Sequence, residues 1–509
     1  MGQYITKEEF QKLQPGFKNK KLKIVLCHGV FDLVHPGHII HFQEAKKLGD
    51  LLVVSITAAQ YVRKGPGRPY FDDEMRVEFL KAIEYIDYVM ISEGYTGEDI
   101  IETVKPDLYV KGREYEKTED DITGKINQEM DQVRSYGGEI AYTSGAVFSS
   151  TKLINNLMPV LNQEMKDYLN EFNKSYTMEA VKHYSDRISK KKVLVIGDAI
   201  IDKYTYCNIQ GLMSKDMGYS ARYEKEEEYL GGSLAIARHI ASFTTQVTVA
   251  TIIGNENPVH SRLLNEMSDK MHLNLVCSEH FPTIVKQRFI TTNEKREEFH
   301  KVFSVNNLPN PMIIDAQAMQ EFIRRLKDTI EEYDLVVVCD FGHGLITKEV
   351  IELVEKKAHF LAINCQTNSS NYGLNVITKY HRADAFTLDQ KELKLAYPTY
   401  DMKEEESLEC LAKSLGGAGW LTRGALGAYG VSEGKVHTCP AFTLKVKDTI
   451  GAGDAFYAVA SLYLAAGASV ELGTFMGNIA GALAANIVGN KESIDQVNVL
   501  KYASTLLNI

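Results

Sequence analysis

The chain has 509 residues, of which 44% are hydrophobic, and a formal net charge of −10 from 57 basic and 67 acidic residues. A chain of this length is expected to form two to four domains, each with enough apolar residues for a core. The charges form no basic stripe along the sequence, so nucleic acid is excluded as an expected partner. The seven cysteines form no CxxC pair, which favours reduced cysteines in a cytoplasmic protein. The most apolar stretch, 455–470, is too short for a membrane span, so no membrane partner is expected.

Strand-like and helix-like stretches alternate in the first part of the chain. Strands are expected at 23–30, 51–57, 87–92, 107–112 and 139–144, and helices at 38–49, 72–86 and 98–106. This alternation predicts a parallel sheet with helices on both faces. Ligands of such sheets bind beyond the carboxyl ends of the strands.

A second alternating series follows a polar, helix-prone stretch that has no glycine. It begins at 192–202 and continues through 329–344, 358–364, 383–393 and 418–431 to two closing helices. The expected organisation is therefore α/β, with two doubly wound domains at 1–155 and 191–509 and a helical connector at 156–190.

The stretch "GVFDLVHPGH" at 29–38 places His35 and His38 around Pro36 and Gly37, directly after a predicted strand. Proline suits the first turn of a helix, and glycine lets the backbone come close to a ligand. The start of a helix binds anions, and two imidazoles beside it can donate hydrogen bonds to phosphate oxygens. Phosphoryl or nucleotidyl transfer is the interpretation. A zinc site is the alternative, but no third ligand at metal spacing is evident nearby.

Residues 23–155 resemble the cytidylyltransferase-like superfamily, which carries HxGH. Further motifs match in order: "RKGPGRP" (63–69), "DEMR" (73–76), "DLYVKGREY" (107–115) and "VFSSTKLI" (147–154). The resemblance implies a Rossmann-like domain that transfers a nucleoside monophosphate from a triphosphate to a phosphorylated small molecule and releases pyrophosphate. It implies that His35 and His38 are catalytic and that the nucleotide is bound by Gly29, Phe31, Lys64, Arg68, Lys111, Ser149, Ser150 and Thr151.

Two of these matches also have simpler explanations. Lys64 and Arg68 lie in a glycine-rich loop and can neutralise a triphosphate, but Lys64 taken alone is equally a solvated cation. The run Ser149-Ser150-Thr151 precedes an apolar helical stretch and taken alone is an ordinary helix cap. The ordered set of motifs favours the functional interpretation.

The stretch "DTIGAGDAFYAVASLYL" at 448–464 is the most specific in the chain. The glycines can aim backbone N–H groups at a phosphate, and Asp454 can accept a proton from an attacking hydroxyl. A glycine-rich turn capped by an aspartate is the simpler alternative. The stretch resembles the closing signature of the ribokinase-like, or PfkB, carbohydrate kinases. No GxxxxGK[ST] motif occurs, which excludes a P-loop kinase.

This second resemblance implies a ribokinase-like domain with a small β lid at about 203–230 that often forms dimers. It implies that Asp454 is the catalytic base and that Asp202, Gly231 and Gly232 bind the sugar. The nucleotide would be bound by Thr422, Gly424, Gly427, Gly451, Ala452, Gly453 and Asn478, and Asp389 and Glu392 would organise Mg²⁺.

The chain departs from the kinase pattern at several positions that face the substrate. Ala235 stands where an asparagine is usual, and Asp389 replaces the asparagine of NxxE. The sequences "NCQ" (364–366) and "DFGHG" (340–344) stand where heptose kinases have "DPK" and "DYAKG". In the first domain "KGREY" replaces "KGGDY". The identity of the acceptor therefore stays open.

Together the two halves resemble the bifunctional heptose kinase/adenylyltransferase family with the domain order reversed. The implied function is phosphorylation of a sugar with ATP, followed by transfer of a nucleoside monophosphate from ATP or CTP to the sugar phosphate. The product would be an ADP-heptose-like activated sugar for surface polysaccharide synthesis, made with Mg²⁺ by a cytoplasmic homodimer. Two alternatives remain open: CDP-activation of a small polyol or acid phosphate, and a kinase-like half that only senses a ligand.

Overall fold

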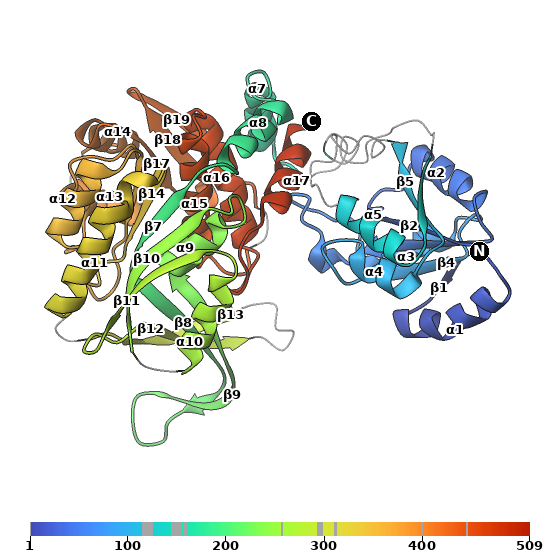
Figure 1. The fold of residues 1–509 in the computed structure, drawn as a ribbon, viewed down its shortest axis with the longest axis horizontal. Helices are drawn as coiled ribbons and strands as arrows, with labels where there is room; N and C mark the ends of the chain where they lie inside the picture. The colour runs from blue at the N-terminus through green and yellow to red at the C-terminus, as the bar shows by residue number, and fades with distance from the viewer. Residues whose placement is uncertain are drawn as a thin grey trace. The chain divides into compact units, whose positions relative to one another are not determined.

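The computed structural model describes residues 2–113, 126–143, 155, 160–255, 258–292, 299–309, 313–398, 401–443 and 446–508. The predicted nucleotide ligands Ser149, Ser150 and Thr151 lie outside these residues. The chain divides into two compact units, one made of Met1–Ser175 with Leu500–Ile509 and the other of Tyr176–Val499. Each unit is α/β (Figure 1).

The first unit is built on a six-stranded sheet in the order β1-β4-β3-β2-β5-β6, and every neighbouring pair is parallel. Its strands are β1 Gln3–Tyr4, β2 Ile24–Gly29, β3 Leu51–Thr57, β4 Tyr88–Ser92, β5 Leu108–Gly112 and β6 Glu139–Thr143. Its helices are α1 Lys7–Asn19, α2 Pro36–Lys46, α3 Asp73–Lys81, α4 Glu98–Val104, α5 Ile126–Ser135 and α7 Gln163–Phe172, with a 3₁₀ turn η1 at Ala59–Tyr61.

Alternate residues of β2 enter two separate cores. Val25 and Cys27 belong to a cluster with Phe42 of α2, whereas Ile24 and Leu26 belong to a second cluster with Phe10 of α1. Successive side chains of a strand point to opposite faces of its sheet. The continuous apolar run therefore covers both faces, as the doubly wound prediction requires, and that prediction is confirmed.

The second unit contains a nine-stranded sheet in the order β11-β10-β7-β14-β15-β16-β17-β18-β19. The pairs from β11 to β17 are parallel, and β17, β18 and β19 are joined by antiparallel pairs. The strands are β7 Val193–Gly197, β10 Val247–Gly254, β11 His272–Ser278, β14 Leu335–Asp340, β15 Leu361–Cys365, β16 Ala385–Asp389, β17 Ala418–Thr422, β18 Ala428–Ser432 and β19 Lys435–Cys439.

The helices of the second unit include three that follow the last strand, where the sequence predicted two. They are α8 Met178–Ile188, α9 Ser233–Ile240, α10 Pro258–Ser268, α11 Ala316–Thr329, α12 Lys348–Lys357, α13 Gln390–Ala396, α14 Glu404–Leu415, α15 Ala452–Ala465, α16 Val470–Ala484 and α17 Gln496–Leu507, with 3₁₀ turns η4 Ile330–Glu332, η5 Ile377–Lys379 and η6 Gly424–Leu426. Residues of α17 from Leu500 onward group with the first unit.

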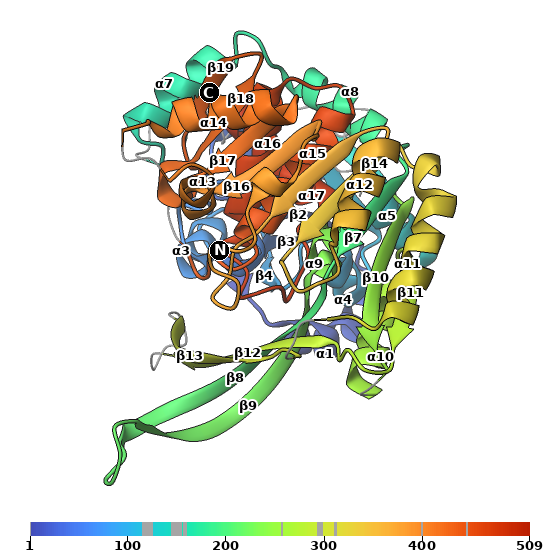
Figure 2. The same ribbon diagram turned by 90° about the vertical axis from the view of Figure 1, so that its left-hand side faces the viewer.

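A second, four-stranded sheet of this unit has the order β13-β12-β8-β9. Its strands are β8 Ala199–Leu212, β9 Tyr219–Gly232, β12 Ile284–Thr292 and β13 Phe299–Asn307. Figure 2 shows β8 and β9 as a long pair that extends away from the nine-stranded sheet. This sheet is the small β lid that the sequence predicted. Across the described part of the chain, no helix has both the length and the apolar character that a membrane span requires.

Candidate active sites

The histidine pair lies at the start of α2, in the first unit. His35 is the N-cap of the helix, and its Nδ1 accepts a hydrogen bond from the backbone N–H of His38 at 3.4 Å. Pro36 occupies the first turn, as predicted. The two rings stack with their centroids 3.8 Å apart. Both imidazoles therefore lie at the N-terminus of the helix. The first backbone N–H groups of a helix have no carbonyl partner within the helix and can bind an anion.

Both histidines are neutral at pH 7. Burial, followed by the charges of His35, His41 and Lys64, lowers the pKa of His38 to about 3. Burial also lowers the pKa of His35. Within the described residues, Nδ1 of His38 is buried and has no hydrogen-bond partner. The negative charge of a bound phosphate would raise both pKa values, because it stabilises the protonated rings.

The ring of Phe31 packs between Gly29 and the ring of His38. Phe31 has a left-handed backbone with φ +48°, and its ring lies so close to Gly29 that a Cβ there would be 3.1 Å from Cζ. The Phe31 ring meets that of His38 edge to face, with centroids 5.2 Å apart. A side chain at Gly29 would therefore have to displace the Phe31 ring by a few tenths of an ångström.

The loop from Lys64 to Arg68 contains two glycines with left-handed backbones, Gly65 at φ +114° and Gly67 at φ +64°. The pKa of Lys64 is lowered to about 8, first by desolvation of its ammonium group and then by neighbouring positive charges, although the side chain as a whole is exposed. Arg68 lies 3.6 Å from Asp32, which also accepts hydrogen bonds from the backbone N–H groups of Tyr70 and Phe71. Asp32 thereby shapes the loop that carries both predicted cations.

Lys111, the third predicted cation, is the last residue but one of β5 and pairs with Glu129 of α5 at 2.9 Å. Burial alone would raise the pKa of Glu129, but Lys111, His28 and hydrogen bonds lower it to about 2. Sequence reasoning missed His28 and His41, whose Nδ1 atoms lie 2.6 Å from Ser55 Oγ and 2.8 Å from Thr143 Oγ1. His41 could have been found, because it lies one helical turn after His38.

The predicted kinase residues of the second unit surround a cavity of about 350 Å³. Of the predicted residues, those that line it are Asp202, Gly232, Asp389, Glu392, Thr422, Gly451, Gly453 and Asp454. In the described part of the unit, Gly231, Gly424, Gly427, Ala452 and Asn478 do not line it. A larger hollow of about 860 Å³, lined by residues such as Thr248 and Asp269, contains none of the predicted groups.

Asp202 on β8 is buried and held from two sides. It forms an ion pair with Arg288 of β12, and Asn490 Nδ2 donates a hydrogen bond to its Oδ2 at 2.8 Å. A Cβ at Gly231 would lie 2.3 Å from this Oδ2, and Gly232 has a left-handed backbone at φ +58°. Gly231 therefore makes room for the carboxylate of Asp202, whereas a Cβ at Gly232 would lie 2.6 Å from the carbonyl oxygen of Asp198.

Asp454 lies in the first turn of α15, and Gly451 caps that helix with φ +81°. Gln366 Nε2 donates a hydrogen bond to Oδ1 of Asp454 at 2.8 Å. Burial and the charge of Asp202 raise the pKa of Asp454 to about 6, whereas Gln366 and Lys286 act in the opposite direction. The carboxylate is thus mostly ionised at pH 7 yet basic enough to take a proton.

Asp389 and Glu392 form the capping box of α13. This structural role by itself explains why these two residues stand at these positions. Asp389 accepts from the N–H of Glu392 at 2.8 Å, and Glu392 accepts from the N–H groups of Asp389 at 2.8 Å and Thr367 at 3.0 Å. Both also line the cavity, where burial and the charge of Asp389 raise the pKa of Glu392 to about 8. A cation between them would offset this repulsion, so the pair fits Mg²⁺. The described residues include no group of three or more metal-ligating side chains.

Gly427 of the predicted nucleotide loop and Asn478 both pack against the backbone at Cys439 and Pro440. Gly424 and Gly427 have left-handed backbones, and a Cβ at Gly427 would lie 2.0 Å from the carbonyl oxygen of Cys439. Asn478 donates to the carbonyl oxygens of Cys439 at 3.2 Å and Pro440 at 3.3 Å. Asn478 therefore fixes the backbone that packs behind the loop.

Comparison with known families assigns the two halves. Residues 190–496 match the pfkB family of carbohydrate kinases. The chain belongs to this family. Residues 26–156 match the cytidylyltransferase-like family, so the transferase segment precedes the pfkB segment, as the motifs predict.

Each of the similar proteins described next matches one part of this chain. Bifunctional protein HldE of Syntrophotalea carbinolica is 40% identical over 119 residues, 23% of each chain, and that of Gluconobacter oxydans is 36% identical over 141 residues, 27% of this chain and 28% of the relative. These matches lie in the N-terminal part and span about a quarter of the relatives' length. Phosphofructokinase-2 from Escherichia coli with substrates and products covers 62% of this chain and 99% of its own at 16% identity and a TM-score of 0.48.

The pfkB unit contains site residues that sequence reasoning did not single out. Lys286, Arg288 and Asn490 line the cavity beside the predicted groups, and so does Gln366, which the sequence marked only as part of the divergent stretch 364–366. Lys286 and Arg288 lie two residues apart on β12, so their side chains point to the same face of the lid sheet. The alternation "KQR" is a signal that could have identified both.

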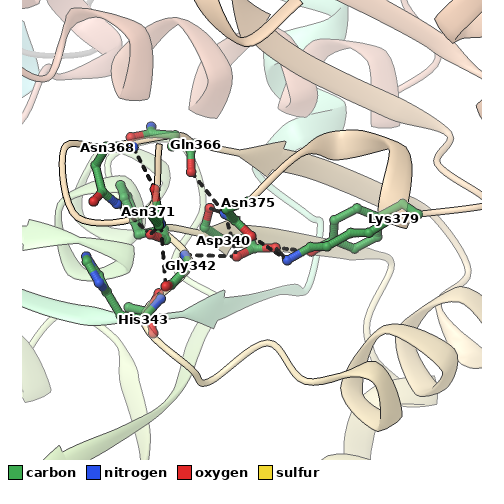
Figure 3. Close-up of polar contacts among 11 residues, drawn as sticks. Asp340, Gly342, His343, Gln366, Asn368, Asn371, Asn375 and Lys379 are labelled. Atoms are coloured by element: carbon green, nitrogen blue, oxygen red, sulfur yellow. Dashed lines mark hydrogen bonds and ion pairs between the residues drawn. The ribbon is translucent and has the colours of Figure 1, made fainter. Parts of the chain in front are cut away.

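A polar network behind the cavity fixes the segment that carries Gln366 (Figure 3). Asn375 Nδ2 donates to the Asp340 carbonyl at 3.2 Å, to Asp340 Oδ1 at 3.1 Å and to the Gln366 carbonyl at 2.9 Å. Lys379 pairs with Asp340 at 2.5 Å, and Asn371 donates to the carbonyl of Phe341 at 2.9 Å. The network holds both Gln366 and Phe341, which line the cavity.

His343, which replaces the lysine of "DYAKG", is fully buried beside this network. Burial, followed by the charge of Lys286, lowers its pKa to about 4, so the ring is neutral. Among the described residues neither ring nitrogen has a hydrogen-bond partner. This position therefore carries an uncharged ring where the heptose kinase motif has a lysine.

Proposed function

We propose that this chain phosphorylates a sugar with ATP and then transfers a nucleoside monophosphate from ATP or CTP to the sugar phosphate, with release of pyrophosphate. The product would be an ADP-heptose-like activated sugar used for surface polysaccharide. The observation that carries the proposal is that Asp454, with a pKa of about 6, lines one cavity with the anchored carboxylate of Asp202. The stacked pair of His35 and His38 in the other unit supports the second reaction.

In the kinase step, Asp202 accepts a hydrogen bond from the sugar, and its position is set by Arg288 and Asn490. Asp454 takes the proton of the attacking hydroxyl, whose oxygen forms a bond to the γ-phosphorus while the bond to ADP breaks. The backbone N–H groups of Gly451 and Gly453, which line the cavity, would stabilise the developing negative charge. Mg²⁺, when held by Asp389 and Glu392, would supply further neutralisation of the ATP phosphates.

In the transfer step, an oxygen of the sugar phosphate attacks the α-phosphorus of the nucleotide, and the bond to pyrophosphate breaks. His35 and His38 donate hydrogen bonds to the phosphate oxygens as their charge grows. Lys64 and Arg68 bind the triphosphate and the leaving pyrophosphate. No residue of the chain needs to form a covalent intermediate.

We further propose that the chain forms a homodimer through the lid sheet. Large apolar side chains are exposed on its strands and turn, including Leu212, Met217, Tyr219, Tyr223 and Phe303. Apolar groups gathered on one small sheet favour a protein contact. Light scattering after size-exclusion chromatography should give twice the chain mass, and Leu212→Glu with Tyr219→Glu should give the monomer. A monomeric wild-type protein would contradict this part.

The proposed chemistry is tested with purified protein, ATP, and a panel of sugars, sugar phosphates and polyols. Mass spectrometry should detect one phosphorylated product, and pyrophosphate release in parallel reactions should show whether ATP or CTP is the nucleotide donor. CTP with a polyol phosphate would instead establish CDP-activation. Absence of any phosphorylated product, with pyrophosphate release retained, would reject the kinase step and favour a ligand-sensing pfkB half.

A further inference from the structure

The last residues of the chain lie outside the kinase match and belong to the transferase unit. The pfkB match ends at residue 496, and Leu500–Ile509 groups with Met1–Ser175. The described part of this segment, 500–508, is helical to Leu507. Nothing in the cytidylyltransferase-like match at 26–156 accounts for this added segment.

The segment packs against the loop that carries Lys64 and Arg68. A Cβ at Gly65 would lie 3.4 Å from Thr505 Cγ2 and 3.8 Å from Tyr502 Cε1. Asn155 donates from Nδ2 to the carbonyl oxygens of Thr505 at 2.9 Å and Asn508 at 3.1 Å, and its Oδ1 accepts from Arg68 at 2.8 Å. Tyr502 and Thr505 are both buried. The helix is therefore packed against the loop that carries two of the cations predicted to bind phosphate.

Lys501 lies on the loop-facing side of this helix. It precedes Thr505 by four residues, and Thr505 Oγ1 donates to the Lys501 carbonyl at 3.0 Å, so the two lie one above the other on the same face. The charge of Lys501 lowers the pKa of Lys64, after desolvation, and also contributes to the lowered pKa of His28. Lys64 lies on a loop and His28 lies near the end of β2, and the charge of Lys501 acts on both.

Among the described residues, after desolvation, the charges of Lys501, Arg68 and Lys111 lower the pKa of Lys64, and the charge of Asp32 acts in the opposite direction. Asp32 already accepts two backbone hydrogen bonds and lies beside Arg68, and Glu129 pairs with Lys111. Within the described residues, Lys64 forms no ion pair. Like charges held together are offset when a polyanion binds.

We propose that Lys501 binds the phosphate chain of the nucleotide in the transferase site, together with Lys64, Arg68 and Lys111. The C-terminal segment thereby completes a site whose other residues all come from the first third of the chain. This inference rests on the proposed nucleotidyl transfer and adds a binding residue to it.

Replacement of the charge tests the inference in the full-length protein. Lys501→Met keeps the aliphatic stem but removes one charge-assisted contact, so the KM for the nucleotide in pyrophosphate release should rise about tenfold or more. Lys501→Arg should restore most of the affinity. The control is Lys413→Met, an exposed lysine on α14, which should leave this KM unchanged. ATP consumption by the pfkB site should stay within about twofold of wild type in all three.

A second measurement does not depend on turnover. Trace acetylation of lysines, read by mass spectrometry, is performed with and without ATP, CTP or pyrophosphate. Lys501 and Lys64 should be protected over the same concentration range, and Lys413 should not be protected. Protection of Lys64 without protection of Lys501, or an unchanged KM in Lys501→Met, would overturn the role of Lys501 while nucleotidyl transfer stands. If no probe changes the acetylation of Lys501 or Lys64, the proposed nucleotide binding at this site is overturned, and with it the proposed role of Lys501.

Discussion

At the scale of single residues, Asp454 carries the kinase proposal. Its replacement by asparagine keeps the size of the side chain and can keep the contact with Gln366, but it removes the base. We expect the kcat of sugar phosphorylation to fall by about 10²–10⁴-fold, measured by coupled ADP release. Pyrophosphate release from a supplied sugar phosphate should not change. Retained phosphorylation by a folded Asp454→Asn protein would remove Asp454 from the chemistry.

The same carboxylate sets the pH dependence of the kinase step. Its pKa is raised to about 6, so the fraction that is ionised and able to accept a proton falls as the pH drops below about 6. The kcat should therefore decline about tenfold per pH unit on the acid side. The hydrogen bond from Gln366 stabilises the ionised form, so Gln366→Ala should move the acid limb to higher pH. A limb that moves to lower pH in this variant would contradict the assignment.

How far the sites could be predicted depends on how local their residues are. His35 and His38 lie together at the start of α2, and Gly451 and Asp454 lie together at the start of α15. Because each pair is only a few residues apart on one helix, its sequence motif already specifies its geometry. Gln366 and Asn490 reach the Asp454 cavity from segments about 90 and 36 residues away along the chain. A contact of this kind depends on the strand order of the sheet, which no local pattern specifies.

At the scale of elements, the parallel sheets were predicted well because apolar runs and helical stretches alternate so regularly. The strand β2 runs over Ile24–Gly29, within the expected 23–30, and its continuous apolar character reflects burial on both faces. Ends of helices were predicted less well. The stretch 72–86 forms α3 only to Lys81, because Ile83 and Ile86 continue as turns that pack into the sheet core.

The segment between β15 and β16 is the element on which the position of Gln366 depends. Asn375→Ala removes a side chain that donates to Asp340 and to the Gln366 carbonyl, and it leaves buried acceptors without that donor. We expect a loss of about 1–3 kcal/mol in the free energy of unfolding of the pfkB unit, measured by urea denaturation. The KM for the sugar should also rise.

A substitution in the same segment provides the control for that experiment. Tyr372 is 67% exposed, so Tyr372→Ala should change both quantities little. Equal effects of Asn375→Ala and Tyr372→Ala would show that the network does not position the site.

At the scale of the whole molecule, the two proposed sites belong to units that have separate sheets and separate cores. Each reaction should therefore survive the loss of the other. His38→Ala should lower pyrophosphate release by about 10²–10³-fold. The His38→Ala variant should therefore accumulate the sugar phosphate, which the Asp454→Asn variant cannot make.

A mixture of these two variants should then restore synthesis of the nucleotide sugar from free sugar, because the sugar phosphate released by one protein can bind to the other. Mass spectrometry of the product, with ATP and the donor nucleotide in excess, measures this directly. Each variant alone, at the same total concentration, is the control. If the mixture makes no nucleotide sugar while each variant keeps its remaining activity, the intermediate does not leave the chain that made it, and the two sites do not work as independent enzymes joined in one polypeptide.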